Sequence, residues 1–106
     1  MYYIYPLTND DKNVLYTGVT NDLLKRITQH FYDRGNRKTF TGRYACFNLL
    51  YFEEYSNIRN AIEREKEIKG WSRKKKEKLI GKENPEFLFL NKFLFDGWPP
   101  EESLTW

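Results

Sequence analysis

The sequence of 106 residues has a single cysteine, Cys46, and no hydrophobic run that approaches the ~20 residues of a bilayer span. One cysteine excludes an internal disulfide framework and favours a reducing compartment. The first residues have neither the basic nor the apolar stretch of a signal peptide, so we expect a mature cytoplasmic protein with no membrane partner. Internal repeats and low-complexity linkers are also absent from the sequence. Collagens, coiled coils, secreted mini-proteins and membrane proteins are therefore excluded.

The composition is that of one globular domain. Hydrophobic residues make up 40% and charged residues 31%, a balance that favours a packed core over disorder. Lysine and arginine number 18 against 15 acidic residues, so the formal net charge is only +3. A chain of this length has room for one hydrophobic core. We expect a single domain over residues 1–96 and a C-terminal extension over residues 97–106.

The pattern of apolar residues predicts three strands and three helices. Strands are expected where aromatic and β-branched residues lie between turn residues, at 2–7, 14–19 and 47–53. Helices are expected after capping residues, beginning at Thr20 or Asn21, at Ser56 or Asn57, and at Ser72. Residues 32–45 have no clear period and are expected to form a long loop. The predicted fold class is α+β, with a small three-stranded antiparallel or mixed sheet flanked by helices in the order β-β-α-β-α-α.

One acidic residue interrupts the apolar stripe of the second predicted helix. Helical spacing places Ile58, Ala61, Ile62 and Ile68 on the inward face, and Glu65 falls in the middle of that face. A buried carboxylate needs a cation, a proton or a metal ion, because leaving it unpaired costs several kcal/mol. Both a structural ion pair with a nearby lysine or arginine and a functional site agree with this pattern.

A second group of polar residues lies on the first helix and the hairpin. Arg26 and His30 are four residues apart and therefore neighbours at one edge of the helix's apolar stripe. Tyr5 and Tyr16 lie in the two hairpin strands, and Gly18 follows near the end of the second strand. Each residue alone is typical of an ordinary surface or core position. Together with an inward carboxylate, they indicate a phosphate-handling site.

The order and spacing of these residues resemble the GIY-YIG nuclease superfamily. The resemblance covers residues 2 to about 90 and is to the small stand-alone members related to the endonuclease domain of the excision-repair C subunit. The first signature reads Tyr3-Ile4-Tyr5, with a tyrosine in place of glycine, and the second reads Tyr16-Thr17-Gly18. Arg26, His30 and Glu65 match the arginine, histidine and glutamate positions that follow these signatures in the family.

What the resemblance implies is a DNA endonuclease that depends on one divalent ion, Mg²⁺ or Mn²⁺, held by Glu65. Tyr5 would be the general base for the attacking water, with Tyr16 orienting that water or exchanging roles with Tyr5. Arg26 would grip the phosphate through its planar fork of donors, and His30 would assist by hydrogen bonding. The expected activity is structure-selective or weakly specific cleavage in DNA repair or recombination, with branched or damaged DNA as partner.

Basic residues beyond these motifs are candidates for contact with DNA phosphates. They occur in the expected loop, where aromatic residues are interleaved with them, and at the start of the third helix; they are Arg34, Arg37, Lys38, Arg43, Arg73, Lys74 and Lys75. A solvated helix face is the alternative interpretation of such a run. Because no second DNA-binding domain is evident, specificity would come from DNA shape or from a protein partner, and the oligomeric state is left open.

Two departures from the family pattern support an alternative function. Val19 stands where some members have a lysine, and Glu77 stands where certain members have an asparagine. A non-catalytic nucleic-acid-binding or partner-recruiting module that keeps the fold is therefore a second hypothesis. A third is a protein-interaction domain that uses the apolar C-terminal segment around Phe93, Phe95 and Trp98.

Overall fold

A computed structural model describes residues 1–100 and has an α+β fold built on a four-stranded antiparallel sheet. Strands β1 (Tyr2–Thr8) and β2 (Leu15–Thr20) form the predicted antiparallel hairpin. The other edge of β1 pairs with β3 (Asn48–Leu49) and with β4 (Glu53–Tyr55). β1 is therefore the central strand, and β2 forms one edge of the sheet.

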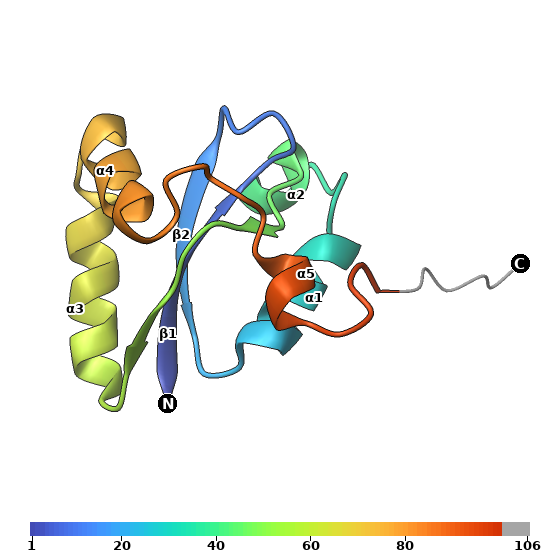
Figure 1. Ribbon diagram of the computed structural model, residues 1–106. Helices are drawn as coiled ribbons and strands as arrows, with labels where there is room; N and C mark the ends of the chain where they lie inside the picture. Colours follow the sequence, from blue (N-terminus) through green and yellow to red (C-terminus); the bar gives the residue numbers. More distant parts are fainter. Residues whose placement is uncertain (101–106) are drawn as a thin grey trace, which may run out of the picture.

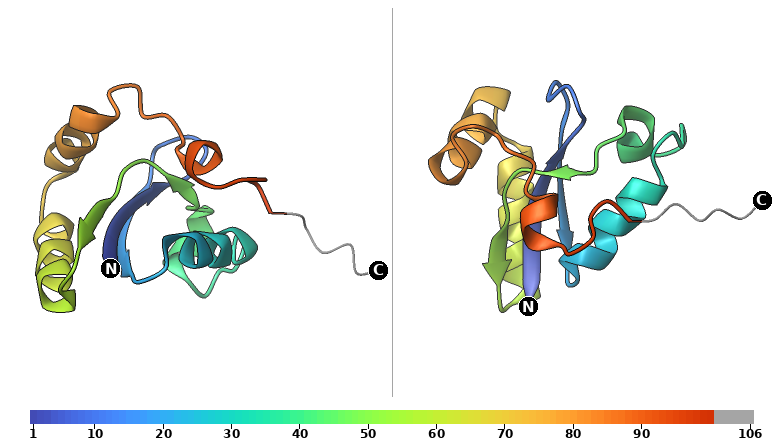
Figure 2. Two further views of the ribbon diagram at one scale, coloured as in Figure 1. Left: turned by 60° about the horizontal axis from the view of Figure 1, so that its bottom comes forward. Right: turned by 45° about the vertical axis from the view of Figure 1, so that its right-hand side comes forward.

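Helices cover both sides of this sheet, as Figures 1 and 2 show. On one side lie α1 (Leu23–Tyr32) and α2 (Phe40–Tyr44), and on the other lie α3 (Ile58–Lys69) and α4 (Arg73–Glu83). The short α5 (Asn91–Leu94) follows in the C-terminal segment.

Alternating residues of β1 divide the core into two clusters, because neighbouring side chains in a strand point to opposite faces. Tyr5 and Leu7 pack with Leu23 and Ile27 of α1. Ile4 packs on the opposite face with Ala61 and Ile68 of α3. The central strand thus carries side chains into both layers.

The α+β fold class is confirmed, while several local predictions need correction. Asn57 and Ser72 are the N-caps of α3 and α4, as expected. The cap of α1 is Asp22, whose carboxylate accepts from the Lys25 amide, and not Thr20 or Asn21. The expected third strand is present as two short segments, β3 and β4.

The segment expected to be a long loop contains α2. The Gly35 amide donates to the Gly42 carbonyl, and the Thr39 hydroxyl donates to the Asp33 carboxylate. These contacts stabilise the helix, and the spacing of apolar residues in the sequence does not indicate them. Two residues expected to face inward on α3 are exposed, Ile58 at 50% and Ile62 at 36%. Within residues 1–100, each helix is too short or too polar to cross a membrane.

The C-terminal segment folds back against β3. The Leu90 amide donates to the Leu49 carbonyl, and the Leu49 amide donates to the side chain of buried Asn91. In the expected extension, Trp98 packs edge-on against Phe31 of α1, whereas residues 101–106 lie outside the described part of the chain. The segment thereby covers an edge that would otherwise present unpaired backbone groups.

Candidate active site

The candidate site begins with a close approach of Tyr5 to Gly18. These residues are directly paired between β1 and β2, and the Tyr5 ring lies across the glycine. A Cβ added at Gly18 would come within 2.5 Å of both Cζ and the hydroxyl of Tyr5. A glycine at this position therefore allows the phenol to reach from the central strand across β2.

The Tyr5 hydroxyl connects the strand to α1 through two hydrogen bonds. Arg26 donates to it from Nε over 3.2 Å, and it lies 3.0 Å from Nε2 of His30. The other ring nitrogen, Nδ1 of His30, lies 3.1 Å from the hydroxyl of Thr41 in α2. A neutral imidazole completes this chain when Tyr5 donates to Nε2 and Nδ1 donates to Thr41.

Burial sets the protonation of both groups. Burial raises the pKa of the Tyr5 phenol to about 12, although the hydrogen bond from Arg26 acts in the opposite direction. Burial also lowers the pKa of His30 to about 4, with the positive charge of Arg26 adding to the effect. At neutral pH the buried pair is therefore a neutral phenol and a neutral imidazole.

Tyr16 differs from Tyr5 because it faces open space. It lines a cavity of about 510 Å³ between α1 and α2, together with Arg26, His30 and Thr41. Its ring lies 6.4 Å from that of Tyr5 and 5.7 Å from that of His30, measured between centroids, and it stacks on Phe40 at 6.2 Å. Two phenols, a guanidinium and an imidazole from three elements are thus brought together.

Glu65 approaches this group from α3. Its side chain is 14% exposed, and its charge contributes to the raised pKa of Tyr5. The carboxylate Oε1 lies 3.3 Å from Nζ of Lys69, and the same ammonium lies 5.9 Å from the centroid of the Tyr16 ring. The structure therefore contains the ion pair that the sequence allowed, and that pair connects Glu65 to the phenol side of the site.

The Glu65 carboxylate is the acidic group of this site that a hard divalent ion could use. Within residues 1–100 there is no group of three or more His, Cys, Asp or Glu side chains that could hold a metal. A single carboxylate suits Mg²⁺ or Mn²⁺, which complete their coordination with water and phosphate oxygens. Lys69 is about half exposed at its side chain, so it can move aside and leave the carboxylate to an ion.

The predicted DNA-contacting residues form two groups. Those of α2 and of its connection to α1 lie near the cavity, and those of α4 lie on the other side of the β1–β2 hairpin (Figures 1 and 2). Lys74 and Lys75 are exposed, and the Lys75 ammonium lies 4.4 Å from the centroid of the Trp71 ring. Arg73 instead donates to the carbonyls of Lys12 and Asn13, both over 2.7 Å, and so ties α4 to the hairpin turn.

In the first group, Arg37, Lys38 and Arg43 are exposed, and Nη2 of Arg43 donates to the Arg37 carbonyl over 3.1 Å. Arg34 donates to the Phe31 carbonyl over 2.7 Å, and its guanidinium carbon lies 3.8 Å from the centroid of the Phe31 ring. The exposed side chains at 37, 38 and 43 are therefore better placed to meet a phosphate than Arg34.

Asn84, the first asparagine after Glu77 in the sequence, makes its side-chain contacts within the fold. Its amide donates to the carbonyls of Leu50 and Leu88 and accepts from the Leu88 amide, so all its contacts serve the fold. Glu77 pairs with Arg73 within α4.

Residues 1–78 match the model of the GIY-YIG catalytic domain. The chain belongs to the GIY-YIG family. Over 82 residues it is 35% identical to a UPF0213 protein of Natronomonas pharaonis, a stretch that covers 77% of this chain and 93% of the relative. A UPF0213 protein of Clostridium perfringens is 41% identical over 80 residues, which cover 76% of this chain and 83% of that protein.

A solved structure agrees with this assignment. The solution NMR structure of a UPF0213 protein from Bacillus halodurans has a TM-score of 0.53 and 30% identity, covering 89% of this chain and 98% of that one. The chain therefore has the fold of a small GIY-YIG protein. GIY-YIG domains form a nuclease family whose members generally use divalent metal ions.

Two residues of the site were not predicted from the sequence. Thr41 reaches His30 only because the connection after α1 folds into α2, and no local pattern indicates this. The pairing of Lys69 with Glu65 could have been predicted, because Lys69 lies four residues after Glu65 on the same helix and such side chains are neighbours.

Proposed function

We propose that this GIY-YIG protein is a divalent-metal-dependent endonuclease that hydrolyses phosphodiester bonds in DNA. The observation that carries the proposal is that Tyr16, Arg26 and His30 line one cavity. Buried Tyr5 hydrogen-bonds to Arg26 and His30, and Lys69, the ion-pair partner of Glu65, lies by the Tyr16 ring. We further propose that cleavage is structure-selective or weakly specific, in repair or recombination, because the exposed cations of this domain can contact phosphates without reading bases.

Glu65 would hold the Mg²⁺ or Mn²⁺ ion. When bound, such an ion supplies Lewis-acid polarisation of the scissile phosphate and neutralises charge on the departing oxygen. The ion would take the place of the Lys69 ammonium, which balances the carboxylate in this structure.

Tyr16 is better placed than Tyr5 to take a proton from the attacking water. It lines the cavity, whereas Tyr5 is 1% exposed and its hydroxyl is already engaged by Arg26 and His30. The raised pKa of Tyr5 also disfavours its phenolate. Tyr5 would instead act as a positioning residue that holds Arg26 and His30 toward the cavity.

Arg26 would bind the substrate phosphate. Its Nε is used on Tyr5 and its Nη1 on Gln29 over 3.1 Å, and the guanidinium lines the cavity. A guanidinium is suited to this role because it offers several donors in one plane and stays charged at any working pH. His30 would act through Tyr5 by fixing the orientation of the phenol.

The decisive experiment compares wild type with Glu65→Gln on a panel of nicked, flapped, branched and linear DNA, with Mg²⁺ or Mn²⁺ present. We expect cleavage to fall at least ~100-fold in Glu65→Gln, because the metal-binding charge is lost. The matched control is Glu63→Gln, an exposed residue of the same helix, which should cleave as wild type does. Undiminished cleavage by a folded Glu65→Gln protein would remove Glu65 from the site.

A non-catalytic role is the second candidate, and the existing pair between Glu65 and Lys69 favours it, since the carboxylate has a partner without a metal. This alternative predicts salt-dependent DNA binding by wild type with no cleavage on any substrate or metal of the same panel. Whether the wild-type protein cleaves any DNA of the panel therefore distinguishes the endonuclease from the non-catalytic binding module.

A further inference from the structure

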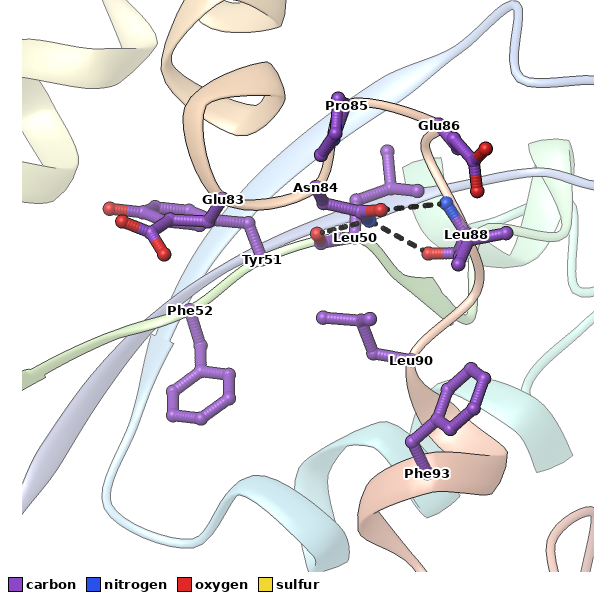
Figure 3. A pocket seen from close by; sticks show the side chains of 10 residues that line it. All are labelled: Leu50, Tyr51, Phe52, Glu83, Asn84, Pro85, Glu86, Leu88, Leu90 and Phe93. Carbon is purple, nitrogen blue, oxygen red and sulfur yellow. Dashed lines mark hydrogen bonds between the residues drawn. The ribbon is translucent and has the colours of Figure 1, made fainter.

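A second, apolar hollow lies away from the candidate active site. It has a volume of about 590 Å³ and forms where the C-terminal segment crosses residues 50–52. Figure 3 shows Phe52 facing Leu90 and Phe93 across it, with Leu50 and Leu88 completing the apolar lining. None of the residues that line this hollow lines the cavity of Tyr16 and His30. The two sites can therefore be filled at the same time.

The apolar side chains here are unusually exposed. Phe93 is 74% exposed, and Leu88 and Leu94 are both close to half exposed. Covering a phenylalanine side chain contributes roughly 1.5–3 kcal/mol, so leaving it in water forgoes a substantial stabilisation. Exposed apolar patches of this kind commonly mark interaction surfaces.

A smaller hollow of about 360 Å³ continues this surface on the other side of α5. It shares Phe52 with the first hollow and adds Leu24 and Leu94. We call the two hollows together the α5 groove. Its apolar lining, which runs over two hollows that share Phe52, suits an extended or helical segment of a protein.

Charge decides what kind of segment the α5 groove fits. Glu83 and Glu86 lie on the first hollow, and Asp22 and Glu54 lie on the second. Among residues 1–100, no lysine or arginine lines either hollow, although the whole chain carries 18. Four carboxylates repel nucleic acid and attract cations.

We propose that the α5 groove binds an amphipathic segment of a partner protein, with apolar side chains on one face and lysine or arginine beside them. The last six residues of this chain fit poorly, because they contain Glu101 and Glu102 and no cation. The groove residues from 83 to 93 also lie beyond the part of the chain that matches the GIY-YIG catalytic domain, residues 1–78. The proposal is independent of nuclease activity.

The test uses two synthetic helical peptides with the same leucine face, one carrying lysines and the other glutamates. We expect the lysine peptide to shift backbone amide NMR signals of residues around Leu50, Phe52 and Leu90, and the glutamate peptide to leave them unchanged. Phe93→Ser should weaken the lysine peptide about tenfold, as loss of a central aromatic contact does. The matched control is Ile58→Ser, which removes a half-exposed apolar side chain from α3.

Charge reversal provides the second arm. Glu83→Lys combined with Glu86→Lys should weaken the lysine peptide and allow the glutamate peptide to bind, because the sign of the groove changes. Binding that is equal in wild type and Phe93→Ser, or lysine-peptide shifts confined to other surfaces, would overturn the proposal. So would concentration-dependent dimerisation of the wild type that is lost in Phe93→Ser by analytical ultracentrifugation, since a second copy would then be the occupant.

Discussion

At the residue scale, the candidate site depends on groups that are neutral although they are titratable. Tyr5 and His30 share a hydrogen bond in a nearly closed environment, and the charged partner, Arg26, lies at its edge. The positive charge of Arg26 therefore lies at the cavity, where a phosphate would bind, while buried Tyr5 and His30 stay uncharged. The protonation of His30 is the part of this arrangement that can be measured directly.

We predict that the free energy of unfolding decreases as the pH is lowered, because of His30. Its folded pKa is about 4, below the ordinary value of 6.5, so the unfolded chain binds the proton first as pH falls. The contribution is complete above about pH 6.5 and is lost toward pH 4; between pH 7 and pH 5 this costs about 2 kcal/mol. Urea unfolding of wild type and His30→Gln at both pH values measures it.

The glutamine variant is the matched comparison because its side chain keeps hydrogen-bonding capacity but does not titrate. It should be less stable than wild type at pH 7 and lose about 2 kcal/mol less on going to pH 5. If both proteins lose the same free energy of unfolding, His30 takes up a proton as readily in the folded state as in the unfolded chain, contrary to the lowered pKa described above.

At the element scale, two buried asparagines hold the C-terminal segment to the sheet. Asn84 binds the Leu50 carbonyl, and Asn91 both accepts from the Leu49 amide and donates to the Phe47 carbonyl. These contacts take the place of a further strand at this edge. Asn84 also lines the first hollow of the α5 groove.

We predict that Asn91→Ala destabilises the protein by about 2–4 kcal/mol, because it leaves the buried Leu49 amide and Phe47 carbonyl without partners. Urea unfolding measures the loss, and hydrogen exchange at the Leu49 amide should speed up in the same variant. Lys92→Ala, at the exposed neighbouring position, should change neither quantity. An Asn91→Ala protein as stable as wild type would show that the segment is held chiefly by its apolar contacts.

The elements that could be predicted from the sequence are those whose signals are local. The caps at Asn57 and Ser72 and the strands of the hairpin need only neighbouring residues to be recognised. The exposure of Ile58 and Ile62 could not be predicted, because α3 faces the sheet with Ala61, Ile68 and the charged residues between them.

The inward face of α3 shows why. Arg64 makes a bidentate ion pair with Glu53 of β4, over 2.9 and 3.0 Å, a long-range contact that the apolar pattern of the helix does not indicate. The candidate site residues were named from the resemblance to a family, while their partners Thr41 and Lys69 depend on how distant segments meet.

At the scale of the whole molecule, two surfaces differ in the charge of the side chains that line them. Exposed cations of the α1–α2 connection and of α4 lie on either side of the β1–β2 hairpin, while the α5 groove carries carboxylates. Although the net charge is only +3, one surface carries cations that attract phosphates and another carries carboxylates that repel them. DNA would meet the hairpin side, and its affinity should depend on salt.

We predict that Arg37→Ala combined with Lys38→Ala weakens DNA binding and lowers the salt slope, the change in log K with log salt concentration, by about 1.5. Fluorescence anisotropy with a branched DNA between about 50 and about 200 mM salt measures that slope. Lys66→Ala, an exposed cation of α3, should leave it unchanged. A slope that is the same in the double variant and wild type would place the DNA elsewhere on the molecule.

The contact of Tyr5 with Gly18 has a consequence for how mutational data on this protein should be interpreted. A substitution scan that changes one position at a time would rank Gly18 among the reactive groups, since adding even a methyl displaces the phenol and, with it, the histidine and arginine it holds. The glycine would nevertheless touch neither DNA nor ion. The side chains at positions 5 and 18 compete for the same space, so only paired substitutions that shrink one as the other grows can separate their effects.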